Sequence, residues 1–239
     1  MERKSYSPKT SLKDYVSKTG ELLFGLLLFG LGSYLTVQAN IGLPPWWAFD
    51  MGLSRVTGID YGIVHNGVAF AIILVDLLIR EKIGWGMIGD ALIVGAVVSV
   101  CNRFGLLPPM GGWISGILCM VVGLFVIAIG SFFYMDAGFG AGPRDALMVA
   151  LCRALHRLSV GTVRILLEGS ALLVGWLLGA KVGLGTLVYM FGMGLAIEIV
   201  FRIARFDATR VKNESLLDTH RNLFRLLKEK TSESSKTSG

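Results

Sequence analysis

The sequence predicts an all-α polytopic membrane protein made of two tandem, inverted repeats, each with three transmembrane helices and one short re-entrant helix. Of its 239 residues, 53% are apolar and only 17% are charged, so the chain lacks the polar surface of a soluble domain. Apolar stretches of about 18 residues or more, long enough to cross the hydrocarbon core, follow one another from Leu22 to Ile203. Breaks rich in Gly and Pro recur within this region at an interval of about 98 residues.

Positive charge is concentrated at the two ends of the chain. The formal net charge is +6, and lysine and arginine are frequent in residues 1–20 and again from Arg202 onward. Basic segments next to membrane spans mark the cytoplasmic side, so we expect both termini in the cytoplasm. A basic balance also fits a nucleic-acid partner, but no groove-reading motif or basic-aromatic platform accompanies it, and no such partner is expected.

The two repeats are recognised by their glycines and prolines. When the chain is shifted by 98 residues, Gly42 falls on Gly140 and Pro45 falls on Pro143. Because these residue types determine the path of the backbone, two copies of one membrane unit are predicted. A shift of 99 residues gives further matches, which pair Gly62 with Gly161, Gly86 with Gly185 and Gly95 with Gly194. The resulting divisions are an N-terminal tail (1–20), repeat 1 (21–104), repeat 2 (113–204) and a basic C-terminal tail (205–239).

Each repeat is predicted to contain one full span, one short segment and two further spans, bounded by these glycines and prolines. In the C-terminal tail, residues 205–228 are expected to form an amphipathic surface helix, and the Thr-, Ser- and Lys-rich end is expected to be disordered. The segments of repeat 1 are 22–37, 45–56, 62–79 and 85–101, and those of repeat 2 are 113–135, 143–155, 160–178 and 185–203.

The short segment of each repeat decides the topology. About 13 helical residues cover roughly 20 Å, less than the hydrocarbon thickness of about 30 Å, so these segments are re-entrant half-helices or oblique spans. If they re-enter, the two repeats are inverted. That six-span arrangement gathers loop charges on the cytoplasmic side, whereas eight full spans divide them about evenly, so the positive-inside rule favours six spans and two half-helices. The charges concerned are Arg80, Lys82, Arg144, Arg153 and Arg157.

The Gly/Pro breaks are expected to start the short helices. Pro45 and Pro143 suit the first helical position, where the N–H that proline lacks has no partner. The glycines before them, Gly42, Gly140 and Gly142, shape the backbone. In an inverted pair both helix N-termini point toward the middle of the membrane, where their partial positive charge and free N–H groups attract an anionic group. Since non-helical backbone is tolerated at that depth only inside protein or beside water, a polar pocket is predicted there.

Six residues are candidates for binding a solute at this centre. Charges in the middle of a membrane cost several kcal/mol unless they are paired or hydrated, so intramembrane charges are functional candidates by default. Structural ion pairing of the arginines with neighbouring acids, and a packing role for the histidine, are the alternatives left open. The candidates are Arg144 and Asp145 after the second break, Trp46 after the first, Arg164 and Glu168 one turn apart in the following span, and His65, the counterpart of Arg164.

Enzyme signatures are missing from the sequence. The three cysteines are far apart and form no CxxC pair, and none of the three histidines sits in a metalloprotease helix signature. The string GFGAG imitates a dinucleotide-binding loop, but a membrane span precedes it where a strand would be needed. No Gly-Lys-Ser/Thr of a phosphate-binding loop follows. We therefore expect neither an enzyme nor a metal or cofactor.

Four stretches carry a resemblance to a known family: ANIGLPPWWAFDMGLS, GFGAGPRDALMVAL, SVGTVRILLEGSALLVGWLLG and VGLGTLVYMFGMG. Over about residues 20–203 the chain is similar to the bacterial YczE/YyaS/YitT-type integral membrane proteins. The resemblance implies a small multi-pass protein of the bacterial cytoplasmic (inner) membrane, and it implies no particular activity. Repeat 1 lacks the Arg-Asp pair of repeat 2, so the two halves of any site are expected to be unequal.

The residues themselves predict a small-solute transporter or channel, with an anion as the favoured solute and with its binding site at the two helix N-termini. The lipid bilayer and the solute are the expected partners, and association between copies of the chain is left open. The alternative is a membrane scaffold that does not transport and that docks a partner through the basic tail after Arg202.

Overall fold

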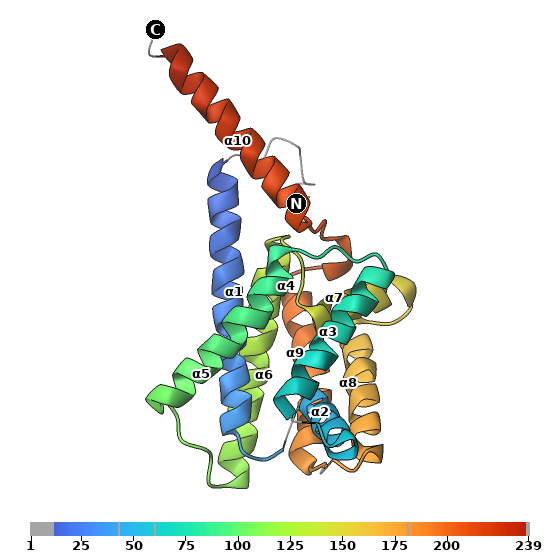
Figure 1. Ribbon diagram of the computed structural model, residues 1–239. Helices are drawn as coiled ribbons and strands as arrows, with labels where there is room; N and C mark the ends of the chain where they lie inside the picture. Colours follow the sequence, from blue (N-terminus) through green and yellow to red (C-terminus); the bar gives the residue numbers. More distant parts are fainter. Residues whose placement is uncertain (1–11, 43, 60, 181, 238–239) are drawn as a thin grey trace.

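The computed structural model describes residues 12–42, 44–59, 61–180 and 182–237, and within this part of the chain the regular elements are all helices, with no strand. The predicted all-α class is thus confirmed. A π-helical turn, η1 (Asp90–Val94), joins α4 to α5, and a 3-10 turn, η2 (Ala208–Arg210), precedes α10. In chain order (Figure 1) the helices are α1 (Leu12–Gln38), α2 (Pro45–Thr57), α3 (Tyr61–Leu78), α4 (Trp85–Gly89), α5 (Gly95–Phe104), α6 (Trp113–Asp136), α7 (Pro143–Ala154), α8 (Val160–Leu177), α9 (Leu184–Ile203) and α10 (Leu216–Thr237).

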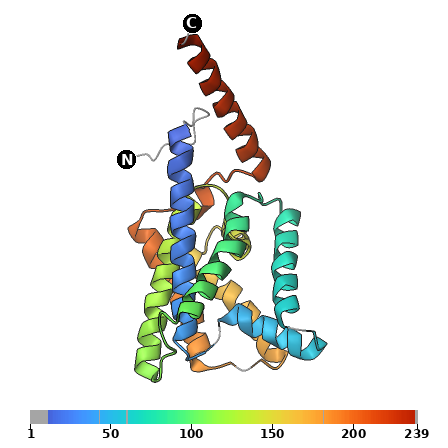
Figure 2. The same ribbon diagram turned by 60° about the vertical axis from the view of Figure 1, so that its left-hand side comes forward.

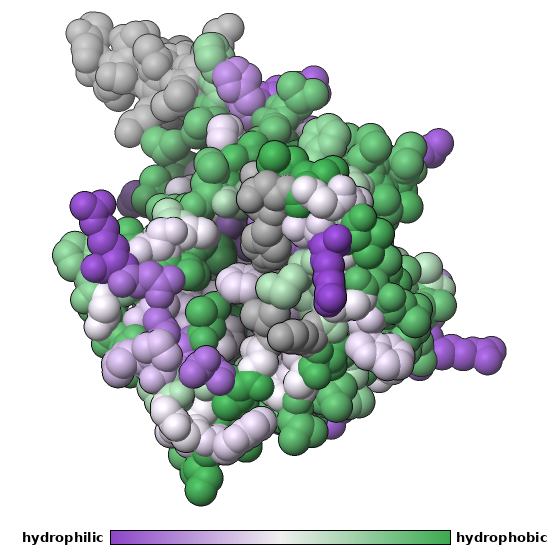
Figure 3. Space-filling model, turned by 60° about the horizontal axis from the view of Figure 1, so that its bottom comes forward, coloured by the Kyte–Doolittle hydropathy of each residue, from purple (hydrophilic) through white to green (hydrophobic). Residues whose placement is uncertain are grey.

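Five helices are long and apolar enough to cross a membrane. They are α1, α6, α8, α9 and the continuous helix Trp85–Phe104 that α4, η1 and α5 form together. Each has at least 18 residues, which at 1.5 Å per residue span about 27 Å or more. The apolar part of α3, Ile63–Leu78, is shorter. Many large apolar side chains are exposed on the outside of these helices, as expected of surfaces that face lipid, and they form much of the surface in the view of Figure 3.

The two short helices begin at the predicted prolines. α2 has 13 residues from Pro45, and α7 has 12 residues from Pro143. At roughly 18–20 Å each, both are shorter than the hydrocarbon core is thick. α2 lies at the end of the bundle far from α10, whereas α7 lies toward the end that carries α10 (Figure 1).

α1 and α6 pack against each other in opposite directions along a seam of glycines (Figure 2). Gly25 lies against Gly130, and Gly32 lies against Gly123, so closely that a side chain at any of these positions would meet the backbone of the other helix. Small residues let membrane helices approach in this way. The shift of 98 residues between the repeats converts one contact into the other, because Gly25 corresponds to Gly123 and Gly32 corresponds to Gly130.

The two Gly/Pro breaks are packed in the same reciprocal way. The backbone of Gly140, before α7, lies against Gly86 at the start of α4, and the backbone of Gly42, before α2, lies against Gly185 at the start of α9. Gly140 has a φ of 95°, in the region that favours glycine. Both breaks are therefore held inside the protein by backbone contacts that leave no room for a side chain.

The repeats differ where their second and third spans meet. In repeat 2, Gly161 of α8 packs against Gly194 of α9. In repeat 1, no atom of the described chain lies within 4 Å of the place that a side chain on Gly95, the counterpart of Gly194, would occupy. The close contacts of α3 are with α2 and α7, and Figure 2 shows α3 standing apart from α4 and α5. The seam between α8 and α9 is therefore closed, because glycines of the two helices touch, whereas the corresponding seam at Gly95 is open, because no neighbouring helix of the described chain fills it.

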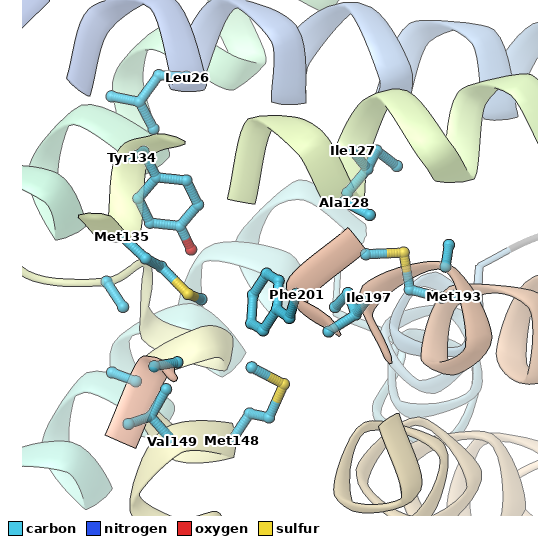
Figure 4. Packing of buried hydrophobic residues seen from close by; sticks show 14 of the residues in the cluster. Leu26, Ile127, Ala128, Tyr134, Met135, Met148, Val149, Met193, Ile197 and Phe201 are labelled. Carbon is cyan, nitrogen blue, oxygen red and sulfur yellow. The ribbon is translucent and has the colours of Figure 1, made fainter. Parts of the chain in front are cut away.

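The main apolar core lies where α6, α7 and α9 meet (Figure 4). Tyr134, Met148, Met193 and Ile197 are almost completely buried there, with Phe201 beside them. Because a fully buried side chain is held by contacts on every side, this core fixes the end of α6 against the start of α7. It thereby positions the hydroxyl group of Tyr134 for the polar network described below.

The C-terminal tail is anchored to the bundle by Glu214. Its carboxylate accepts a hydrogen bond of 2.7 Å from the hydroxyl group of Tyr15 on α1, and its N–H donates one of 2.8 Å to the carbonyl of Gly138. Since these contacts hold the residues before α10, the surface helix begins at Leu216 and not at residue 205 as predicted. It also continues to Thr237, through a stretch that the sequence predicts to be disordered.

Asp218 fixes the first turn of α10. Its carboxylate accepts hydrogen bonds of 3.2 Å from the N–H of Ser215 and 3.2 Å from Nζ of Lys82, and its own N–H donates to Oγ of Ser215 at 3.1 Å. The hydrogen bonds with Ser215, and then the one from Lys82, hold the pKa of Asp218 below its usual value. A capping residue three positions before an acid is the usual start of a helix, and here it also ties α10 to the loop after α3.

Candidate functional site

The starts of α2 and α7 meet inside the bundle. The guanidinium of Arg144, the second residue of α7, stacks over the indole of Trp46, the second residue of α2, with 4.8 Å between Cζ and the ring centre. Nη2 of Arg144 also lies 4.0 Å from Oδ2 of Asp50, one turn further along α2. A cation over the face of a tryptophan within about 6 Å is attracted to it. The two breaks, far apart in the sequence, therefore bring their first side chains to one place.

Asp145 is the centre of a buried hydrogen-bond network. It accepts hydrogen bonds from the hydroxyl group of Tyr134 on α6 and from Nη1 of Arg164 on α8. Nε of Arg164 lies 3.1 Å from Oε1 of Glu168. The side chains of these two acids and of the arginine are at most 5% exposed. Arg164 thus bridges acids on two helices. Its ion pair with Glu168, one of the alternatives that the sequence left open, is present in the structure. Asp145 pairs with Arg164 and not with its neighbour Arg144.

His65 makes the corresponding contact in repeat 1. Its Nδ1 lies 2.7 Å from Oδ2 of Asp50, so His65 on α3 reaches the short helix of its own repeat, as Arg164 on α8 reaches Asp145. Asp50 is completely buried, whereas the side chain of His65 is 38% exposed. Sequence reasoning did not include Asp50 among the site residues, although an acid one turn after Trp46 could have indicated it.

Asp90 lies beside the second break. It begins the π-helical turn, and a side chain on Gly142 would collide with its carboxylate. Asp90 also lies within the electrostatic influence of Asp145, Arg144 and Arg164. π-turns inside α-helices occur frequently at functional sites. The structure brings Asp90 to the site, with Gly142 supplying the space.

Acids outnumber bases in the assembled site. Four carboxyl groups share it with two guanidiniums, so acidic groups outnumber the arginines by two. Within the described chain, Oδ1 of Asp50 and Oε2 of Glu168 are buried without a hydrogen-bond partner. Nε1 of Trp46 and Nε of Arg164, both donors, are likewise buried there without a hydrogen-bond partner. The site therefore has unmet capacity for both donors and acceptors, and its excess of acidic groups favours a cation. The carboxylates are those of Asp50, Asp90, Asp145 and Glu168, and the guanidiniums are those of Arg144 and Arg164.

A second polar region lies at the end of the bundle near α10. A pocket of about 710 Å³ opens there between the α7–α8 turn, the end of α9 and η2. Glu198 accepts hydrogen bonds from the N–H of Gly161 at 3.1 Å and from Arg202 at 2.9 Å. Arg153, also in its lining, pairs with Glu81. Because these charges satisfy each other, this pocket is a weaker candidate for a ligand than the central site.

Comparison with known proteins places the chain in a family. Residues 16–202 match the family described as "Family of unknown function (DUF6198)". The chain belongs to this family. Three bacterial proteins are similar to it, and no solved structure matches. They are an "Uncharacterized protein" of Haemophilus influenzae, 32% identical over 182 residues (76% of this chain, 82% of that protein), the "Uncharacterized membrane protein YczE" of Bacillus subtilis, 28% identical over 178 residues (73% and 80%), and the "Uncharacterized protein YyaS" of Bacillus subtilis, 25% identical over 188 residues (75% and 90%).

The match to the DUF6198 family confirms the resemblance that the Gly/Pro and Gly-Pro-Arg-Asp stretches indicated. The matched region, residues 16–202, contains every residue of the central site. α10 lies beyond it. Together with the apolar helices, the similarity to a membrane protein of Bacillus subtilis identifies the chain as a membrane protein.

Proposed function

We propose that this DUF6198-family protein moves a small solute across the bacterial cytoplasmic membrane, and that the solute binds where the starts of α2 and α7 meet. One observation carries the proposal: Arg144, Trp46 and Asp50 converge inside an apolar bundle, beside buried carboxylate oxygens that have no hydrogen-bond partner among the described residues. Charges placed inside a membrane are costly and mark solute or ion pathways.

The reciprocal glycine contacts support two repeats of opposite orientation around this site. A pseudo-two-fold axis in the membrane plane exchanges Gly25–Gly130 with Gly32–Gly123, which is the pattern found between α1 and α6. In inverted-repeat transporters the binding site lies at the repeat interface, at the ends of short or broken helices. In this arrangement α2 and α7 re-enter from opposite faces, and both termini lie on the cytoplasmic side.

The charge balance of the site changes the solute that we propose. Helix N-termini alone favour an anion, as the sequence analysis expects, but the site holds more carboxylates than guanidiniums, and Arg164 is already held between two acids. In the part of the chain that the structure describes, the buried acceptor atoms of the site without a hydrogen-bond partner belong to Asp50 and Glu168. We therefore propose a solute that presents a positive charge or several hydrogen-bond donors, such as a small amine or guanidine.

Ligand-induced thermal shifts of the purified protein, followed by uptake into proteoliposomes, test the proposal. The screen compares small amines and guanidines with carboxylates and phosphates of similar size. An amine or guanidine should raise the melting temperature of the wild type and be taken up, and both effects should be lost in Glu168→Gln. Glu198→Gln is the matched control, because it removes an acid of α9 that lies outside the central site. Stabilisation by anions alone, lost in Arg144→Ala, would overturn the proposed charge of the solute.

The tail gives the scaffold alternative one specific observation. α10 projects from the bundle (Figure 1). Its apolar side chains Leu217 and Phe224 are exposed. If docking through this surface is the function, Leu217→Ser with Phe224→Ser abolishes it, while Glu168→Gln does not. If transport is the function, Glu168→Gln abolishes it, while Leu217→Ser with Phe224→Ser does not.

A further inference from the structure

Trp46 and Asp50 form one face of the central site, on α2. They are four residues apart, so both side chains lie on the same side of the helix. The guanidinium of Arg144 contacts both of them, the ring face of Trp46 and the carboxylate of Asp50. An aromatic face and a carboxylate together are complementary to a cation. This face of α2 therefore favours a positively charged group.

The cation at this place comes from the other repeat. Arg144 is the second residue of α7, and its Cζ lies 4.8 Å from the centre of the Trp46 ring. Its Nη2 lies 4.0 Å from Oδ2 of Asp50, farther than the length of a charge-assisted hydrogen bond, about 2.7–2.9 Å. The side chain of Arg144 is also 28% exposed. Arg144 thus occupies the cation position without a short contact to its carboxylate.

Arg164 shows how the same site holds an arginine firmly. Its side chain is only 4% exposed, its Nη1 donates a hydrogen bond to Asp145, and its Nε lies 3.1 Å from Oε1 of Glu168. Arg144 lacks this burial, and the 4.0 Å contact with Asp50 is its one ion pair among the described residues. The two arginines of the site therefore differ: Arg164 is fixed between two acids, and Arg144 is held loosely.

Asp50 keeps capacity for a better partner than Arg144. Its Oδ1 is buried and has no hydrogen-bond partner among the described residues, while its Oδ2 lies 2.7 Å from Nδ1 of His65. A guanidinium donates two parallel hydrogen bonds to a carboxylate and stacks on aromatic faces, whereas an ammonium is a compact charge without a flat face. Because a free guanidinium is not tied to α7, it can approach Asp50 more closely than Arg144 does.

Acids other than Asp50 lie near Arg144. The charge of Arg144 acts on Glu168 and on Asp90. Oε2 of Glu168 is buried without a hydrogen-bond partner in the described part of the chain. Since an arginine side chain is long and has many rotamers, Arg144 can turn toward these acids when it leaves Asp50. Its displacement therefore does not require a guanidinium buried without a carboxylate.

We propose that Trp46 and Asp50 form a subsite for a guanidinium group of the solute, and that Arg144 is an internal stand-in which the solute displaces. This inference rests on the proposed function, and it narrows the solute from amines and guanidines to guanidines. Without solute, Arg144 covers the subsite and compensates Asp50. If Arg144 occupies the subsite about nine-tenths of the time, the apparent affinity for the solute is lowered about tenfold.

Equilibrium dialysis with radiolabelled methylguanidine tests the proposal without any transport, on the protein in lipid nanodiscs. The wild type should bind methylguanidine, and Arg144→Ala should bind it about tenfold more tightly, because the competing guanidinium is gone. Asp50→Asn should weaken binding about tenfold or more, since the cation loses its buried counter-charge. Methylammonium should bind the wild type more weakly than methylguanidine does. Arg202→Ala, which removes an exposed arginine outside the central site, is the matched control and should bind as the wild type does.

Three outcomes would overturn the proposal. If Arg144→Ala binds methylguanidine no more tightly than the wild type, Arg144 is not a competitor. If Arg144→Ala binds it and the wild type does not, even far above the affinity of the variant, the probe only fills the space that the shortened side chain leaves. A preference for methylammonium would exclude a guanidinium subsite.

A second variant and an uptake assay separate the remaining cases. If Asp50→Asn does not fold, Trp46→Phe decides, because phenylalanine keeps an aromatic ring but attracts a cation less strongly, so binding should weaken; unchanged binding overturns the subsite. Tighter binding by Arg144→Ala, without uptake of any amine or guanidine into proteoliposomes, would refute the transport proposal alone. Uptake of a guanidine that Arg144→Ala binds no more tightly than the wild type would refute the stand-in alone.

Discussion

Substitution of two equivalent glycines measures how unequal the repeats are. A methyl group on Gly194 would place its carbon 2.7 Å from the carbonyl oxygen of Gly161, inside the closed seam between α8 and α9. Overpacking of this kind costs about 1–3 kcal/mol. A methyl group on Gly95 meets no atom of the described chain within 4 Å. Since alanine gains the same helix propensity over glycine at both positions, about 1 kcal/mol, this gain cancels in the comparison. Gly194→Ala should therefore be less stable than Gly95→Ala by about 1–3 kcal/mol.

Equilibrium unfolding of both variants and the wild type, in the same detergent or bicelle, checks this difference. The wild type provides the common reference, and Gly95→Ala is the matched control because it makes the same chemical change at the equivalent helix position. Equal stability of the two variants would refute the reasoning, because it would mean that the Gly95 seam is packed as tightly as the Gly194 seam. If Gly95→Ala were the less stable of the two variants, the tightly packed seam would be the one at Gly95, contrary to the structure.

Three further predictions concern the site and the tail. Arg164→Ala leaves two buried carboxylates uncompensated and should lower the free energy of unfolding by about 3–5 kcal/mol. Arg202→Ala, the control, breaks an exposed pair and should lower it by at most about 0.5 kcal/mol. Equal losses in the two variants would contradict the buried network. Gly142→Ala should lower the melting temperature because its methyl group strikes Asp90, and Asp90→Ala in the same chain should restore part of the loss; no rescue would mean that the collision is not the cause. The pKa of Asp218 is lowered in the folded protein, so its contribution to anchoring α10 is present above its usual value of 3.8 and is lost as the pH falls through the folded value. In hydrogen exchange, Asp218→Asn should therefore weaken protection of α10 at neutral pH and match the wild type in strong acid.

The helices could be predicted from the sequence because glycine and proline determine backbone path locally. Predicted starts at 45, 85, 113, 143 and 160 are the observed starts of α2, α4, α6, α7 and α8. The start of α10 could not be predicted in this way, since it depends on Glu214 contacting Tyr15 and Gly138. Local pattern records which residues are polar, but it does not record contacts between residues that are far apart along the chain.

The same limit explains what was missed at the site. Arg164 and Glu168 could be paired from their spacing of four residues, because helix geometry places them on one face. Tyr134 gave no comparable signal, since a tyrosine in the last turn of an apolar span is ordinary, and its bond to Asp145 crosses from α6 to α7. The expectation of an anion considered the helix termini and their arginines. It omitted Asp50 and Asp90, acids that only the folded chain brings to the same place.

The repeats are alike in the residues that shape the backbone and unlike in the residues that carry charge. Glycine stands at both 95 and 194, yet only the second packs against a neighbouring helix in this structure. A glycine with open space around it costs helix stability without any packing return, about 1 kcal/mol relative to alanine. The residues that carry charge differ on the same helices: Asp76 stands on α3 where α8 has Gly175, and Gly175 packs against α2.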